Sequence, residues 1–118
     1  MSNSLALLAV TMGDACGIGP EIAAMAFRRG ALPGAFVLGD VGVMRRASAL
    51  TGGMLPVAVI EHPREVRELP SGCLPVLQGA GLPPDLLEAP LGRIDGRAGA
   101  AAGACIRQAG AVARPGEV

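Results

Sequence analysis

The sequence predicts an α/β fold with a mostly parallel sheet and flanking helices. Short apolar segments alternate with longer segments of helical character, and Gly and Pro residues gather where one kind of segment gives way to the other. Such alternation is typical of parallel strands joined by right-handed crossovers. The chain has 118 residues, which fits one domain or a part of one.

The first strand and helix carry the clearest signals. Leu5–Val10 is a continuous apolar run, which is typical of a strand that is buried on both faces. A helix is predicted over Pro20–Arg29, because Pro20 suits a first helical position and Glu21 faces the positive end of the helix dipole. Gly30 can then adopt the left-handed conformation that ends many helices.

Three more strands and one more helix are predicted before residue 80. The strands are Ala35–Leu38, Pro56–Ile60 and Leu74–Leu77, and the helix runs to Leu50 after a capping Asp40. The strand at Leu74–Leu77 is the weakest of these, because Pro75 lacks the N–H that a sheet hydrogen bond needs. Gly79–Gly92 is predicted to be a loop from its Gly and Pro content.

A last helix is predicted over Gly96–Ala113. Its expected apolar face follows helical spacing and comprises Ala98, Ala101, Ala102, Cys105, Ile106, Ala109 and Val112. Four glycines lower its intrinsic helicity, so it needs tertiary packing, and small residues at this spacing would permit close approach. Arg114–Val118 has the pattern of a helix end followed by the start of another strand. We therefore expect residues 1–118 to be truncated within a larger α/β protein.

Composition and charge disfavour several classes of function. The formal net charge is zero and aromatic residues make up 2% of the chain, so neither the basic face nor the stacking platform of a nucleic-acid-binding protein is expected. The apolar runs are too short to span a bilayer, and no signal peptide is evident. Cys16, Cys73 and Cys105 form no paired spacing, which favours reduced thiols in a cytoplasmic protein.

The segment Thr11–Glu21 is the strongest candidate for a ligand site. It connects the first strand to the first helix, where parallel sheets bind ligands, and its glycines would let the backbone approach an anion near a helix amino end. It matches neither the dinucleotide fingerprint GxGxxG nor a phosphate-binding P-loop. From the residues alone, a ligand-binding loop and a tight turn without a ligand are about equally supported.

Gly13–Ile22 resembles the opening motif of the 4-hydroxythreonine-4-phosphate dehydrogenase family. Isopropylmalate and isocitrate dehydrogenases share Gly-Ile-Gly-Pro-Glu, but here Ala15 and Cys16 separate the acid from the first glycine, as in the former family. Gly39-Asp40 and the segment Gly92–Val118 are also similar to that family. The family usually has Pro in place of Met12 and Ala15 and Ala in place of Cys16, which leaves open a paralogue that acts on a sugar-acid phosphate or an aromatic dihydrodiol.

The resemblance implies a part of an isocitrate/isopropylmalate dehydrogenase-like fold, in which two domains flank a cleft and a homodimer completes the site. It implies NAD(P)-dependent oxidation of the phosphorylated substrate 4-(phosphooxy)-L-threonine with a divalent metal (Zn, Mg or Co), then decarboxylation to 3-amino-2-oxopropyl phosphate for pyridoxal phosphate synthesis. The family's catalytic and metal-binding residues lie downstream, so residues 1–118 alone are expected to be inactive and to bind no metal. Within them, Asp14, Gly17, Ile18 and Gly19 are the expected cofactor-binding residues.

Other polar residues are expected to have structural roles. His62 is a single histidine in a polar stretch and cannot complete a metal site by itself. Cys16 is interpreted as a space-filling residue, Arg28 and Arg29 as a solvated helix end, and Asp95 as the cap of the last helix. A non-enzymatic module that binds an anion or a nucleotide remains the alternative of a different class.

Overall fold

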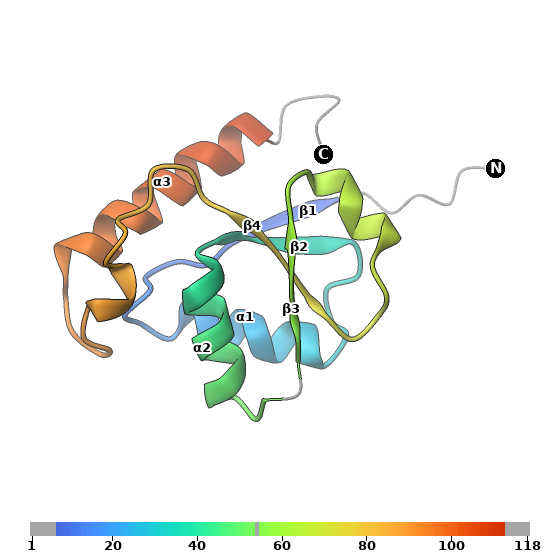
Figure 1. The fold of residues 1–118 in the computed structure, drawn as a ribbon, viewed down its shortest axis with the longest axis horizontal. Coiled ribbons are helices and arrows are strands. Elements are labelled where there is room, and N and C mark those ends of the chain that lie inside the picture. The colour runs from blue at the N-terminus through green and yellow to red at the C-terminus, as the bar shows by residue number, and fades with distance from the viewer. Residues whose placement is uncertain (1–6, 54, 113–118) are drawn as a thin grey trace.

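The computed structural model describes residues 7–53 and 55–112 and confirms the predicted α/β fold. Four strands form one parallel sheet in the order β1-β2-β4-β3 (Figure 1). The elements are β1 (Leu8–Thr11), α1 (Gly19–Arg28), β2 (Ala35–Gly39), α2 (Val41–Leu50), β3 (Val57–Ile60), η1 (Pro63–Glu68), β4 (Leu74–Gln78), η2 (Leu86–Glu88) and α3 (Gly96–Val112). The short 3-10 helices η1 and η2 lie in segments for which the sequence predicted no regular structure.

Burial identifies β2 as the central strand of the core. All five of its residues are buried, so it is covered on both faces. The prediction of a doubly buried first strand is wrong for the described part of that strand, because β1 lies at the edge of the sheet and Leu8 is 52% exposed. Leu5 and Ala6 of the predicted strand lie outside the described residues.

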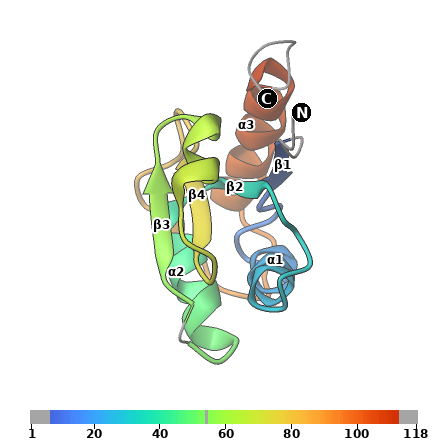
Figure 2. The same cartoon turned by 90° about the vertical axis from the view of Figure 1, so that its right-hand side faces the viewer.

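The helices bury their small side chains against the sheet. Helices α1 and α2 pack side by side, and α3 lies along β1 and β2 (Figures 1 and 2). Val37 of β2 and Val76 of β4 are register partners, and both belong to the main buried cluster. The helices contribute mostly small side chains to it, among them Ala23, Ala24, Ala47, Ala98 and Ala101. The core is therefore built by close packing of short side chains rather than by aromatic rings.

Pro75 lies in a central strand, where proline is normally disfavoured. The Leu74 N–H donates to the Pro56 carbonyl on the β3 side, so strand alternation directs the backbone nitrogen of Pro75 towards β2. The β2–β4 ladder begins only at the pair Val37 and Val76. The missing N–H of Pro75 therefore falls where no ladder bond is required, and β4 tolerates the proline.

The helix ends follow the sequence signals, with one exception. The Asp40 carboxylate accepts a hydrogen bond from the Val43 N–H at 2.9 Å, which confirms the predicted cap of α2. Gly30 has φ +69°, as expected after α1. Arg28, however, is not simply solvated, because its guanidinium donates to the Gly53 and Ser48 carbonyls and so ties the carboxyl end of α1 to that of α2.

Helix α3 forms as predicted over its described length, but its packing differs from the expectation. Ala98, Ala101 and Cys105 are buried, whereas Ile106 is 62% exposed and does not belong to the buried face. Side chains added at Gly96, Gly99 and Gly110 would meet open space, and one added at Gly103 would meet only Arg107 of the same helix. These glycines therefore serve no close contact within the described residues. Ala113 and the predicted strand start after it lie outside them.

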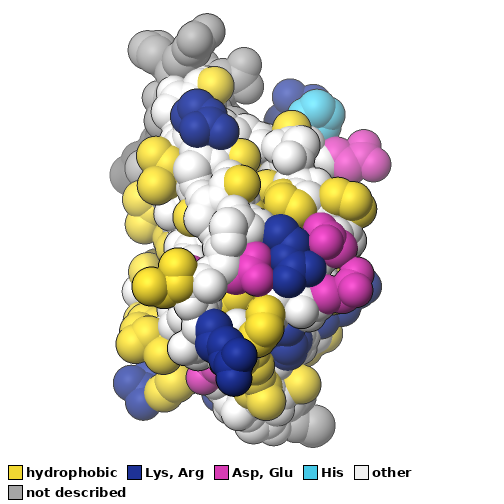
Figure 3. Space-filling view, turned by 90° about the vertical axis from the view of Figure 1, so that its left-hand side faces the viewer, with side chains coloured by type: hydrophobic (Ala, Val, Ile, Leu, Met, Phe, Trp, Pro, Cys, Tyr) yellow, Lys and Arg dark blue, Asp and Glu magenta, His cyan; other side chains and the backbone are white. Residues whose placement is uncertain are grey.

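The surface carries mixed charge. Figure 3 shows the face formed by α3 and the segment that precedes it, on which basic and acidic side chains lie intermingled among scattered apolar ones. Arg97 forms ion pairs with Asp85 at 3.1 Å and with Asp95 at 3.0 Å. Among the helices that the structure describes, none has the length and apolar character needed to cross a membrane.

Candidate functional site at the carboxyl edge of the sheet

The carboxyl ends of the parallel strands meet at one edge of the sheet, which we call the carboxyl edge. β1 is followed there by the loop 12–18, β2 by Asp40, and the last residue of β4 is Gln78. In open α/β sheets, ligands bind in the crevice outside this edge. The predicted cofactor-binding residues therefore lie at the end of the sheet where the fold places ligands.

Asp14 shapes the first half of the loop. Its side chain accepts a hydrogen bond from the Cys16 N–H at 2.8 Å, and its carbonyl accepts one from the Gly17 N–H at 2.9 Å. Gly13, with φ +74°, provides the left-handed backbone that precedes this turn. Asp14 itself is exposed to solvent. It is thus a turn-forming residue whose carboxylate also faces outward.

The three residues after this turn differ in their packing. Gly17 has room for a side chain, because the nearest atoms to an added Cβ are those of Asp14, at 3.5 Å or more. Ile18 is the N-cap residue of α1 and is 70% exposed. At Gly19, an added Cβ would lie 2.7 Å from the Met12 carbonyl oxygen. Gly19 is therefore required by the fold, whereas Gly17 and Ile18 are not held in place by tight packing.

The amino ends of α1 and α2, which follow β1 and β2, differ in how their N–H groups are satisfied. At α2, Asp40 accepts from the Val43 N–H, and the Gln78 side chain accepts from the Val41 N–H at 2.8 Å and donates to Asp40 at 2.9 Å. At α1, the N-cap residue Ile18 forms no side-chain capping hydrogen bond. The positive end of α1 is therefore the one that can receive an anionic or carbonyl group.

Gln78 is a residue that sequence reasoning missed. Its side chain links the end of β4 to the amino end of α2, through Val41 and the capping Asp40. The only available signal was its position, as a polar residue directly after the apolar run of β4.

Cys16 is buried and chemically quiet. Burial raises the pKa of its thiol, the charges of Asp14 and Asp95 raise it further, and Arg46 and Arg97 act in the opposite direction. The amino end of a helix can lower a thiol pKa, but here the net direction is upward. The thiol stays protonated near neutral pH, which agrees with the space-filling role expected of Cys16.

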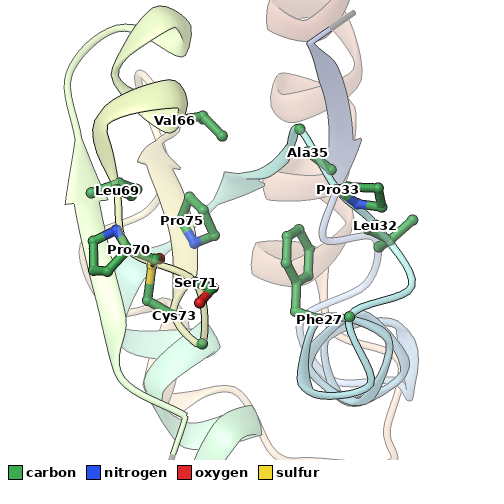
Figure 4. A pocket seen from close by; sticks show the side chains of 13 residues that line it. Phe27, Leu32, Pro33, Ala35, Val66, Leu69, Pro70, Ser71, Cys73 and Pro75 are labelled. Carbon is green, nitrogen blue, oxygen red and sulfur yellow. Dashed lines mark hydrogen bonds between the residues drawn. The ribbon is translucent and has the colours of Figure 1, made fainter. Parts of the chain in front are cut away.

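Two hollows lie at opposite ends of the sheet. One, of about 300 Å³, lies at the carboxyl edge and is lined by Asp40, Gly42, Gln78, Leu82, Pro83, Pro84, Leu86 and Leu87. The other, of about 340 Å³, lies at the amino ends of β2 and β4, between Phe27 and Leu32 on one side and Val66 and Leu69 on the other (Figure 4). Neither hollow is lined by residues of the loop 12–18. We place the candidate site at the carboxyl edge because the loop itself lies at that end of the sheet.

The remaining polar candidates lie in structural positions. His62 is exposed and precedes η1, where its N–H donates to the Glu65 carboxylate at 2.6 Å. Asp95 caps α3 through the Arg97 N–H at 2.9 Å, and hydrogen bonds from Arg97 hold the pKa of this carboxyl below its usual range. Across residues 7–53 and 55–112, no three His, Cys, Asp or Glu side chains gather as metal ligands would.

The chain is similar to two groups of dehydrogenases. It is 37% identical over 78 residues to a 4-hydroxythreonine-4-phosphate dehydrogenase of Trichlorobacter lovleyi, a match that covers 64% of this chain and 23% of that protein. It is 35% identical over 117 residues to a D-threonate 4-phosphate dehydrogenase of Cupriavidus necator, which covers 97% of this chain and 34% of that protein. The chain thus spans at most about a third of the length of these relatives. No model of a protein family matches it.

Solved structures agree with these matches. A crystal structure of 4-hydroxythreonine-4-phosphate dehydrogenase from Klebsiella pneumoniae superimposes with a TM-score of 0.81 at 35% identity, over 99% of this chain and 36% of that one. The corresponding enzyme from Burkholderia phymatum gives a TM-score of 0.82 at 30% identity, over 98% of this chain and 35% of that one. The resemblance to 4-hydroxythreonine-4-phosphate dehydrogenases, which was predicted from the loop motif, is therefore confirmed over nearly the whole chain.

Proposed function

Because this chain is a relative of the 4-hydroxythreonine-4-phosphate dehydrogenase family over nearly its whole length, we propose that it forms the amino-terminal part of an NAD(P)-dependent dehydrogenase. The observation that carries the proposal is the similarity of nearly the whole chain to enzymes named as dehydrogenases of phosphorylated substrates. The amino end of α1, where the N-cap residue Ile18 forms no side-chain capping hydrogen bond, supports a cofactor-binding role for this loop.

The proposed reaction oxidises the secondary alcohol of 4-(phosphooxy)-L-threonine. When bound, NAD(P) would accept the hydride from the carbinol carbon, and the hydroxyl proton would go to a base. The resulting β-keto acid loses carbon dioxide and, once protonated, gives 3-amino-2-oxopropyl phosphate, a precursor for pyridoxal phosphate synthesis. Among the described residues, no group of His, Cys, Asp or Glu could hold a divalent metal. The metal ligands and the catalytic residues of the proposed enzyme would lie in its remaining segments.

Within this chain, the proposed cofactor-binding residues are Asp14, Gly17, Ile18 and Gly19. The open amino end of α1 would donate N–H groups to the cofactor, and the exposed Ile18 side chain would pack against it. The space beside Gly17 would allow close approach of the cofactor. Gly19 would hold the helix at the position from which these groups act.

A second substrate has specific support. D-Threonate 4-phosphate dehydrogenases match over 92–97% of this chain at 35–37% identity. D-Threonate 4-phosphate likewise carries a secondary hydroxyl on the carbon β to its carboxylate, and a terminal phosphate. We therefore propose it as the alternative substrate of the complete protein, which we expect to act as a cytoplasmic homodimer.

The substitution Gly17→Val tests the cofactor role. Because a Cβ at this position meets only ordinary contacts, we expect the free energy of unfolding to change by less than about 1 kcal/mol. The branched side chain would obstruct the approach of the dinucleotide, so KM for NAD(P) should rise about tenfold. The measurement uses the complete protein that contains this chain.

Steady-state kinetics with varied dinucleotide, beside thermal unfolding, gives the readout. Gly110→Ala, in open space on α3, is the matched control and should leave KM unchanged. An unchanged KM in a folded Gly17→Val protein would assign the loop to the fold alone.

A further inference from the structure

One side chain of α2 connects the two loops beside the carboxyl edge. The Arg46 guanidinium donates through Nη2 to the Ala15 carbonyl at 3.2 Å and through Nη1 to the Leu87 carbonyl at 3.3 Å. Ala15 belongs to the loop 12–18, and Leu87 belongs to the segment 79–95 between β4 and α3. A planar guanidinium suits this geometry because its two amino groups point to separate acceptors.

The segment 79–95 holds the same loop at a second point. The Gly92 N–H donates to the Cys16 carbonyl at 2.6 Å. Three successive carbonyls of the loop, those of residues 14, 15 and 16, thus accept hydrogen bonds from Gly17, Arg46 and Gly92. Ala15 and Cys16 are buried as a result, while Asp14 and Ile18 stay exposed at the carboxyl edge. The carbonyls of Ala15 and Cys16 are thus engaged by other segments of the chain, whereas the side chains of Asp14 and Ile18 are exposed to solvent.

Arg46 also places a positive charge beneath the loop. Its hydrogen-bond partners are neutral carbonyls, and among the described residues Arg46 forms no ion pair. The charge of Arg46 therefore adds to the positive potential at the amino end of α1, part of which Glu21 in the first turn of that helix offsets. Arg45, the adjacent residue on α2, is exposed and takes part in none of these contacts.

We propose that Arg46 is a positioning residue, which clamps the loop 12–18 to the segment 79–95 and so holds the turn Asp14–Gly19 in its binding conformation. The clamp itself stands on the hydrogen bonds above. Its consequence for the cofactor rests on the proposed function.

The accessibility of Cys16 reports on the clamp directly. Alkylation of each cysteine by iodoacetamide can be followed by mass spectrometry. In Arg46→Met, Cys16 should react about tenfold faster than in the parent chain, because the loop can then open without breaking two charge-assisted hydrogen bonds. Cys105 is fully buried in α3 and serves as the internal control for global unfolding, so its rate should not change. Arg45→Met, the matched surface variant, should behave as the parent.

Two results would overturn the clamp. One is a Cys16 that remains as protected in folded Arg46→Met as in the parent. The other is a parallel rise at Cys16 and Cys105, which would mean that Arg46 acts on the whole fold. Arg46→Lys keeps the positive charge, but an ammonium group cannot donate to both carbonyls as the two amino groups of a guanidinium do. We therefore expect an alkylation rate of Cys16 between those of the parent and Arg46→Met. A rate equal to the parent's would mean that the charge of Arg46, and not its pair of hydrogen bonds, holds the loop.

The cofactor half of the proposal has its own measurement. In the complete protein, Arg46→Met should raise the Kd for NAD(P) about tenfold, and Arg45→Met should leave it unchanged. An accessible Cys16 with an unchanged Kd would preserve the clamp and remove its role in cofactor binding. A parent protein that binds no dinucleotide would instead refute the proposed function and leave the clamp intact.

Discussion

Gly19→Ala is expected to destabilise the fold by about 3 kcal/mol, because the new methyl group would lie 2.7 Å from the Met12 carbonyl oxygen. The obstacle is backbone at the end of β1, so it cannot rotate away as a side chain could. Relief would require α1 to move from the sheet, and buried Ala23 and Ala24 would move with it. Urea unfolding of the variant and the parent chain measures the difference.

Gly17→Ala is the matched control for this prediction. The same methyl group two residues earlier would meet Asp14 at ordinary contact distances, so a change within about 0.5 kcal/mol is expected. Equal losses at both positions would show that the close approach of α1 to β1 is not what requires Gly19.

Gly39→Ala is expected to cost about 2–3 kcal/mol for a different reason. A Cβ at Gly39 would lie 2.7 Å from the Met12 sulfur and 2.9 Å from its Cβ and Cγ. Met12 is fully buried, and its sulfur accepts a hydrogen bond from the Asp40 N–H at 3.2 Å. The side chain therefore has no free space into which it can turn.

A double-mutant cycle separates this clash from other effects. Met12→Ala alone should destabilise by leaving a cavity, but Gly39→Ala added to it should cost much less than in the parent, because the obstructing atoms are gone. Additive losses in urea unfolding would contradict the assignment of the clash to Met12.

The elements that the sequence predicted correctly are those with local causes. Asp40 caps α2 and Gly30 ends α1 because the relevant hydrogen bonds and backbone angles involve residues a few positions apart. The order of the strands depends on pairing between distant segments, so the weak strand with Pro75 could not be recognised as a central one. The exposure of Ile106 likewise depends on which side of α3 meets the sheet, a choice that helical spacing leaves open.

The same distinction applies to the candidate site. Asp14, Gly17, Ile18 and Gly19 are consecutive enough for a motif to identify them, and the structure brings them into one turn. Arg46 and Gln78 form hydrogen bonds with main-chain groups of residues that are far away in the sequence. Main-chain groups are the same for every residue type, so no sequence pattern identifies these partners. The sequence thus predicted which residues form the turn but not which residues hold it.

Hydrogen exchange with and without bound dinucleotide tests the central claim most directly. In the complete protein that contains this chain, saturating NAD(P)H should slow exchange in peptides that cover residues 12–19, because the cofactor would occupy the amino end of α1. Peptides that cover residues 66–75, beside the hollow at the opposite end of the sheet, should exchange at unchanged rates. Unchanged exchange over residues 12–19 at saturation, or protection confined to residues 66–75, would contradict a cofactor site at the carboxyl edge.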